Sequence, residues 1–181
     1  MQKLPRNKIY SLQEKVLLNF RSKDETRPSL LGIVHYSPLK KRVSCDGHRA
    51  CFISTGYSEA LKDLIIAPDY TVINTEYPKV EQVLPDPKKA TRALIHFPKI
   101  FAIKSKRPTH LYFDGSKFSL ERSESSILAL DTNLILDFLN TDSSFNVDYI
   151  KDSDSSMTPI KIYFYQEYDD NFVVVMPLKM Q

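Results

Sequence analysis

The chain has 181 residues, of which 42% are hydrophobic and 11% aromatic, and this composition is typical of a globular protein rather than a disordered one. A chain of this length can bury one good core or two small ones. Its 4 glycines are too few and too scattered for a Gly-rich phosphate-binding loop. No apolar run reaches the length of a membrane span, and residues 1–20 lack the apolar core of a signal peptide. We therefore expect a cytoplasmic protein with no membrane partner.

Positive charge is concentrated in the first part of the chain. Residues 1–107 contain 20 Lys and Arg against 10 Asp and Glu, whereas residues 108–181 contain 5 against 12. This asymmetry suggests one surface that meets a polyanion such as nucleic acid and another that stays clear of it. Ordinary solvated charge explains the same split equally well.

The first predicted element is a helix after the capping box Ser11-Leu12-Gln13-Glu14, in which the Ser hydroxyl and the Glu carboxylate satisfy amides of the first turn. Apolar residues then recur at helical spacing, at Leu12, Val16, Leu17 and Phe20. The other side of this helix is polar and partly basic. We therefore expect one buried face and one exposed face.

Strands are expected next. The β-rich run 30–36 predicts a strand in which Gly32 allows a close backbone approach. Residues 43–53 predict a hairpin, because Asp46-Gly47 is a favoured turn pair between two apolar runs. The next two elements are a short helix and a strand, over residues 58–64 and 69–75.

A third helix is predicted after Asp86, which would cap it, and Pro87, which suits the first helical position. Pro98 should end this helix near His96. One side of the helix is basic and the other apolar. The basic residues are Lys88, Lys89 and Arg92, and the apolar residues are Ala90, Ala93, Leu94 and Phe97.

The rest of the chain contains further hairpins. Residues 111–121 predict a hairpin that turns at Asp114–Lys117. Residues 134–139 fit either a short helix or a buried strand, and Asn146 could cap a short helix over residues 146–152. The final elements are a closing strand pair, residues 160–165 and 172–176, with residues 167–171 as their turn. The order of elements predicts an α+β fold of two similar lobes, in which helices pack on antiparallel sheets. The first lobe would be residues 1–85 and the second residues 86–181, and the first would be the shortened one.

Two cysteines, Cys45 and Cys51, lie on what we interpret as adjoining strands. In a reducing compartment they are small buried residues rather than a disulfide. With His48 they could form three zinc ligands, but in an extended segment the two cysteines share a face and His48 points away, and no fourth ligand is near. A hydrolase based on His48 and Asp46 lacks a nucleophile and an orienting group. We therefore expect no metal, no cofactor and no enzymatic activity.

Five stretches, taken in order, resemble the bacterial sliding clamp, the β subunit of DNA polymerase III. They are residues 24–32, 43–49 and 77–85, residues 145–149, which resemble the clamp's last helix, and residues 174–179, which resemble its C-terminus. The resemblance covers the clamp's middle and last domains. A bacterial clamp chain has three domains and this chain has room for two, so the resemblance points to a phage or mobile-element clamp in a bacterial or phage-infected cell.

The resemblance implies a processivity factor that encircles double-stranded DNA and tethers a DNA polymerase and other replication proteins through their short linear motifs. Six domains per ring imply a homo-oligomer of three chains, and the need for a clamp loader stays open. In the family, helices line the hole. The residues implied for DNA contact are Lys15, Arg21, Lys23, Lys88, Lys89 and Arg92, together with Arg27 on a loop.

The resemblance also implies a groove that binds partner peptides, with apolar walls and polar anchors at the rim. Its residues would be Leu30, Cys45, Gly47, His48, Arg49, Ala50, Pro78, Gln82, Val83, Val174, Val175, Met176, Pro177 and Leu178. Ala50 and Gln82 replace a larger apolar and a basic residue of the bacterial pattern, which leaves the peptide preference open. The alternative is a clamp-like interaction protein, an inhibitor or a transcription co-activator, that keeps the groove without encircling DNA.

Overall fold

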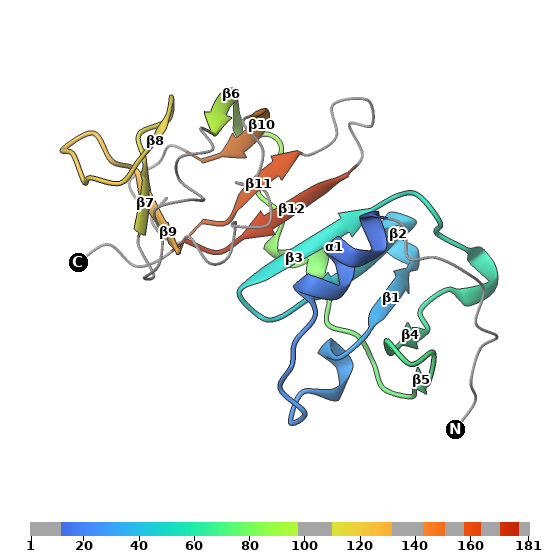
Figure 1. The fold of residues 1–181 in the computed structure, drawn as a ribbon. Helices are drawn as coiled ribbons and strands as arrows, with labels where there is room; N and C mark the ends of the chain where they lie inside the picture. Colours follow the sequence, from blue (N-terminus) through green and yellow to red (C-terminus); the bar gives the residue numbers. More distant parts are fainter. Residues whose placement is uncertain (1–11, 98–109, 132–142, 151–157, 164–170, 178–181) are drawn as a thin grey trace. The chain divides into compact units, whose positions relative to one another are not determined.

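The structure is a computed structural model that describes residues 12–97, 110–131, 143–150, 158–163 and 171–177 (Figure 1). The chain forms two compact units: unit 1 contains residues 1–82 and Asp170–Val173, and unit 2 contains residues 83–169 and 174–181. The described elements are an α-helix, short 3-10 turns and antiparallel strands, so the expected α+β class is confirmed. The predicted lobe limits, 1–85 and 86–181, stay a prediction.

Unit 1 is a helix packed on an antiparallel sheet. Helix α1 spans Leu12–Phe20, and the strands are β1 (Ile33–Tyr36), β2 (Lys41–Cys45), β3 (Arg49–Ile53), β4 (Ile65–Ile66) and β5 (Val72–Ile73). The strand order is β5-β4-β1-β2-β3. Short 3-10 turns connect the strands: η1 (Pro28–Leu30), η2 (Ser37–Leu39), η3 (Glu59–Leu61) and η4 (Val80–Val83).

Helix α1 packs against β2 and β3 (Figure 1). Leu17 and Phe20, three residues apart on the helix, are fully buried, as their spacing predicts. The Ser44 hydroxyl on β2 donates to the Leu17 carbonyl at 2.6 Å, which satisfies a buried polar group. The predicted helix is therefore confirmed over residues 12–20, while Ser11 of the capping box lies outside the described residues.

The predicted 43–53 hairpin is confirmed as β2 and β3, with Cys45 opposite Ala50. The close approach at Gly32 is confirmed too, because a Cβ there would lie 2.7 Å from the Ile66 carbonyl oxygen. One neighbouring prediction was too long. The helix expected over 58–64 is only the turn η3, because the backbone leaves the helical region at Lys62, which has a ψ of 133°.

Two predicted strands are also shorter in the structure than the sequence indicated. The strand expected over residues 69–75 is limited to β5, since Tyr70 adopts a φ of 67°. The strand expected over residues 30–36 begins at Ile33, because Leu30 closes the 3-10 turn η1 after Pro28.

Unit 2 consists of strands in the residues that the structure describes. They are β6 (Thr91–Phe97), β7 (His110–Phe113), β8 (Phe118–Ser119), β9 (Leu128–Asp131), β10 (Ser143–Tyr149), β11 (Ile160–Tyr163) and the end of β12 (Phe172–Val175). One group has the order β12-β11-β10-β6, and a small sheet has the order β8-β7-β9. The predicted 111–121 hairpin and the closing strand pair are confirmed. The ambiguous run 134–139 lies outside the described residues, as does most of the predicted turn 167–171.

The helix predicted from Asp86 is wrong. Asp86 does cap a turn, since its side chain accepts the Lys88 amide at 2.9 Å and its carbonyl accepts the Ala90 amide at 2.9 Å. The chain then extends into β6, whose seven residues pair with all seven residues of β10. The backbone hydrogen bonds of this long ladder outweigh the local helix signal, which consists of the Asp86-Pro87 cap and the apolar spacing after it.

The helix predicted from Asn146 is wrong for the same reason. Residues 145–149, which resemble the last helix of the clamp, belong to the strand β10. Their burial alternates, with Phe145, Val147 and Tyr149 buried and the residues between them half-buried. This period of two is typical of a strand with one face in a core. Among the described residues, no helix is both long and apolar enough to cross a bilayer.

Candidate functional site

The loop between β2 and β3 presents His48 to solvent on a rigid base. The register places Gly47 and His48 at the tip, because Cys45 pairs with Ala50 and the Asp46 amide donates to the Arg49 carbonyl at 3.2 Å. Gly47 has a φ of 96°, which L residues rarely adopt. The Asp46 carboxylate accepts the amides of His48 and Arg49 at 2.9 and 3.0 Å, so it closes the loop.

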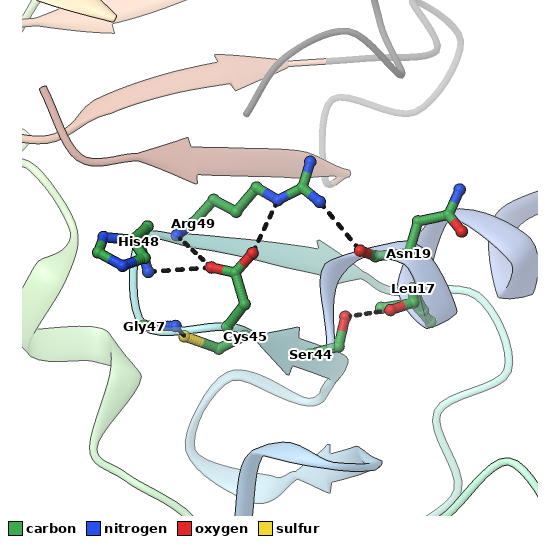
Figure 2. A network of polar contacts seen from close by, with 8 residues as sticks. Leu17, Asn19, Ser44, Cys45, Gly47, His48 and Arg49 are labelled. Carbon is green, nitrogen blue, oxygen red and sulfur yellow. Dashed lines mark hydrogen bonds and ion pairs between the residues drawn. The ribbon is translucent and has the colours of Figure 1, made fainter. Parts of the chain in front are cut away.

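Arg49 ties this loop to helix α1, as Figure 2 shows. Its Nε donates to the Asp46 carboxylate at 3.0 Å and its Nη2 donates to the carbonyl of Asn19 at 3.0 Å. The guanidinium also lies 4.2 Å from the centre of the Phe20 ring. The side chain is only 12% exposed, so Arg49 anchors the loop and presents little of itself to solvent.

Two further segments of unit 1 border the loop. A Cβ at Gly47 would lie 2.9 Å from Nη1 of Arg27, so the predicted DNA-contacting loop and the hairpin tip are neighbours. The phenol of Tyr77 is buried and interacts with Cys45. Burial raises the pKa of Tyr77 well above its usual value, and Cys45 adds to the rise. Tyr77 precedes Pro78, so the segment 77–82 passes near the base of the loop.

The 77–82 segment is held to β1 by a side-chain contact. The Tyr36 hydroxyl donates to the Glu81 carboxylate, and this bond lowers the pKa of Glu81. Burial first, and then the same bond, raises the pKa of Tyr36. The segment therefore has a fixed position within unit 1.

The groove residues predicted in unit 1 differ in what they expose. Leu30 and Ala50 are buried, Cys45 is half-buried, and burial raises the pKa of its thiol. Solvent reaches Gly47, His48, Pro78 and Gln82. The exposed set thus contains a polar ring, an amide and a proline, whereas Leu30 and Ala50 are part of the core of unit 1.

The remaining predicted groove residues belong to unit 2. Val83 is partly exposed, Val174, Val175 and Pro177 are buried, Met176 is half-buried, and Leu178 lies outside the described residues. In unit 2 the strand β12 provides a fully apolar pair, Val174 and Val175. Their role in a groove stays a prediction.

The basic residues predicted in unit 1 lie on and after α1. Lys15, Lys23 and Arg27 are exposed, whereas Arg21 is half-buried and donates to the Ser22 carbonyl at 3.2 Å. Arg27 is paired loosely with Asp24, at 3.6 Å. Unit 1 therefore exposes three of its predicted DNA-contacting cations within residues 15–27.

The basic residues predicted in unit 2 do not form a helical face. Lys88 and Lys89 are exposed in the turn before β6, and Arg92 is on β6 itself. Arg92 binds both Asp148 oxygens, at 2.7 and 3.1 Å, and its Nη2 donates to the Tyr163 hydroxyl at 2.7 Å. Burial alone would raise the pKa of Asp148, but the bonds from Arg92 and Tyr163 lower it. The charge of Arg92 is therefore compensated within its own unit.

No three His, Cys, Asp or Glu side chains come close enough to hold a metal ion in the part of the chain that the structure describes. The Cys45 sulfur instead accepts the Gly47 amide at 3.2 Å, and Cys51 is fully buried on β3. The sequence reasoning missed the anchoring role of Asp46, Asn19 and Phe20. The i, i+3 spacing of Asp46 and Arg49 across a hairpin loop was the available signal.

No protein-family model and no curated protein sequence matches the chain. Its fold is similar to that of solved sliding clamps. The DNA polymerase III subunit beta from Borrelia burgdorferi aligns with a TM-score of 0.60 at 14% identity, over 93% of this chain and 62% of that chain. The C. crescentus beta sliding clamp aligns with a TM-score of 0.60 at 14% identity, over 93% of this chain and 63% of that chain. The DNA polymerase III beta chain from Streptococcus pneumoniae aligns with a TM-score of 0.53 at 14% identity, over 97% of this chain and 67% of that chain. This chain thus has a clamp-like fold and spans about three-fifths of the first two clamps.

Proposed function

We propose that this chain is a shortened DNA polymerase processivity factor, which oligomerises into a ring around duplex DNA and binds replication proteins through their short linear motifs. The observation that carries the proposal is a clamp-like fold that extends over nearly the whole chain. A clamp needs no catalytic group, and the proposed activity is binding alone, with no cofactor. The proposed location is the cytoplasm of a bacterial or phage-infected cell.

The proposed DNA contacts are the exposed cations of unit 1, namely Lys15, Lys23 and Arg27. A protein that holds DNA without reading its sequence needs mobile positive side chains that meet phosphates, and exposed lysines provide them. The concentration of positive charge in residues 1–107 supports this assignment.

The proposed peptide contact begins at the hairpin tip. His48 is exposed there while Arg49, Asp46 and Gly47 keep the loop in one conformation, so a ligand would meet a pre-formed surface. Pro78 and Gln82 are exposed on a segment that the Tyr36–Glu81 bond keeps in place. The resemblance also assigns Val174–Leu178 to the peptide contact, and this assignment stays a prediction.

The molar mass in solution tests the ring. Light scattering of the purified chain at micromolar concentration should give a multiple of 20.9 kDa, with three chains expected. A monomer at every concentration would rule out a ring. The oligomer should then be retained on a closed circular plasmid and lost when a restriction enzyme makes the plasmid linear.

A second candidate is a clamp-like interaction protein that binds a partner without encircling DNA. One observation favours it: the segment expected to form a basic lining helix is the strand β6, and Arg92 is paired with Asp148. This candidate predicts a monomer with equal, weak retention on circular and linear DNA. In both cases replacement of His48 by Ala should weaken binding of the partner peptide.

A further inference from the structure

A cavity of about 410 Å³ lies wholly within unit 1 and has no role in the proposed clamp function. Helix α1 bounds it with Glu14 and Leu18, which are four residues apart and so lie on one face of the helix. The sheet bounds it with Ile33, His35 and Arg42. The connection 56–70 provides the remaining wall. Its volume is in the range of small-molecule sites.

Two hydrogen-bond donors stand side by side on the sheet wall. His35 on β1 and Arg42 on β2 are directly opposite in the register, so their side chains emerge on the same face as neighbours. Both residues are more than nine-tenths buried. Their closeness also affects the pKa of His35, which is lowered to about 4. Burial is the larger cause and the charge of Arg42 is the smaller one.

The hydrogen bonds of His35 fix which atom faces a ligand. Its Nδ1 accepts the Ser58 amide at 3.0 Å, so the proton of the neutral ring is on Nε2. Among the described residues Nε2 has no hydrogen-bond partner. His35 therefore offers the cavity a donor.

Arg42 is held from two sides and has donor capacity left. Its Nε donates to the Thr55 carbonyl at 2.8 Å and its Nη1 donates to the Glu14 carboxylate at 2.9 Å. Its Nη2 lies beside Gly56, where a Cβ would be 3.3 Å away, and no described residue accepts from this atom. Because Gly56 has no side chain, the Nη2 edge stays open to the cavity.

The charge of the cavity argues against an anion. Arg42 is neutralised by Glu14, and His35 is uncharged at neutral pH. A carboxylate that approached Arg42 Nη2 would also approach Glu14, and the repulsion would offset the gain. A carbonyl oxygen has two lone pairs and no charge, so it matches two adjacent donors. Most of the remaining lining is apolar, including Ile66 and Pro68, and Tyr70 adds an aromatic ring with a hydroxyl.

We propose that this cavity binds a small, uncharged, mainly apolar molecule whose carbonyl oxygen accepts hydrogen bonds from His35 Nε2 and Arg42 Nη2. The inference rests on unit 1 alone and does not depend on the proposed ring.

Three probes of similar size test the ligand class: benzamide, benzoate and ethylbenzene. Nuclear magnetic resonance of the full chain would follow the His35 Nε2–H signal and the methyl signals of Ile33 and Ile66. Benzamide at millimolar concentration should shift these signals, with an affinity about tenfold higher than that of either other probe, since one lacks the acceptor and the other carries charge. Equal binding of benzoate or ethylbenzene, or no shift with benzamide, would overturn the proposal.

A filled cavity tests the location. Leu61 lines the cavity and is half-buried, so Leu61→Trp should remove benzamide binding. The matched control is Leu64→Trp, because Leu64 is in the same connection, is 37% exposed and is not among the lining residues. Ala67→Leu provides a milder second filling if the Trp variant does not fold. Binding that survives both fillings, or that disappears in the control, contradicts the assignment.

Discussion

Arg49 was expected to contact a partner peptide, but its position in the structure gives it an anchoring role instead. The resemblance assigns it to the rim of a groove, whereas in the structure it joins the hairpin loop to the end of α1 through Asp46, Asn19 and Phe20. A side chain with an ion pair, a carbonyl acceptor and an aromatic neighbour stabilises its own unit first. Its contribution to partner binding would be to keep His48 in place.

Replacement of Arg49 by Met should lower the free energy of unfolding by about 2 kcal/mol, because the Asp46 carboxylate and the Asn19 carbonyl lose a largely buried donor. Urea denaturation followed by circular dichroism measures this change. The control is Arg27→Met, which removes an exposed and loosely paired guanidinium and should cost less than about 0.5 kcal/mol. Equal effects of the two substitutions would contradict the anchoring role.

His35 should make the stability of the chain depend on pH. Its pKa is about 4 in the folded state and 6.5 in the unfolded state, so between these values the unfolded chain binds the extra proton. Unfolding therefore becomes easier as the pH falls from about 6.5 to about 4, with a loss on the order of 3 kcal/mol. Above pH 6.5 this contribution is constant.

Urea midpoints at a series of pH values would measure the His35 effect. In His35→Gln the amide oxygen can still accept the Ser58 amide while the titrating group is gone, so the slope between pH 4 and 6.5 should flatten. A resonance titration that placed the His35 pKa near 6.5 would contradict the prediction.

Single residues could be predicted where a local rule decides their position. The positive φ of Gly47 and the close approach at Gly32 both follow from the absence of a side chain, and they could be anticipated. The pairing of Arg42 with Glu14 could not, because the two residues are distant in sequence and meet only when α1 packs on β2. The cavity beside them depends on the same packing and left no mark in the sequence.

At the scale of elements, β6 shows why a helix signal can mislead. Asp86 and Pro87 produce one capped turn, and the apolar residues after it fit a helical face as well as a strand. The decision comes from β10, which offers a partner for every residue from Thr91 to Phe97. Long-range pairing of this kind cannot be read from the β6 segment alone.

Two neighbouring substitutions distinguish strand from helix in β6. Leu94 is 66% exposed and Ile95 is fully buried. Leu94→Lys should therefore change the free energy of unfolding by less than about 0.5 kcal/mol, whereas Ile95→Lys should unfold unit 2 because it buries an unpaired charge. In the predicted helix Leu94 belongs to the buried face, so a large cost for Leu94→Lys would support the helix instead. Urea denaturation of both variants measures the difference.

At the scale of the whole molecule, the uneven charge predicts a salt-sensitive interaction with DNA. Lys15, Lys23 and Arg27 are exposed in the basic part of the chain. Their joint replacement by Glu should weaken binding to a DNA duplex at low salt and should flatten the dependence of log affinity on log salt by about 0.9 per lost phosphate contact. Fluorescence anisotropy measures both quantities. Lys117→Glu, in the acidic part, is the control and should leave the slope unchanged.

The general architecture could be predicted, since the α+β class, helix α1 and three hairpins followed from caps, periodicity and turn pairs. The assignment of residues to the two units could not be predicted from such local patterns. Unit 1 includes a short segment near the C-terminus, where the Asn171 side chain accepts the Ser54 amide at 2.9 Å and Phe172 stacks on Phe52 with ring centres 4.6 Å apart. No local pattern in residues 1–82 indicates that this segment is needed.

This late segment has a consequence for synthesis. While the ribosome makes residues 83–169, the Phe52 ring lacks its stacking partner Phe172 and the Ser54 amide lacks its acceptor on Asn171, so unit 1 stays incomplete until residues 170–173 have emerged. An exposed aromatic surface on a nascent chain invites aggregation or capture by a chaperone. A messenger truncated shortly before the codon for Asn171 should therefore yield an insoluble product, although it encodes the described strands β1 to β11.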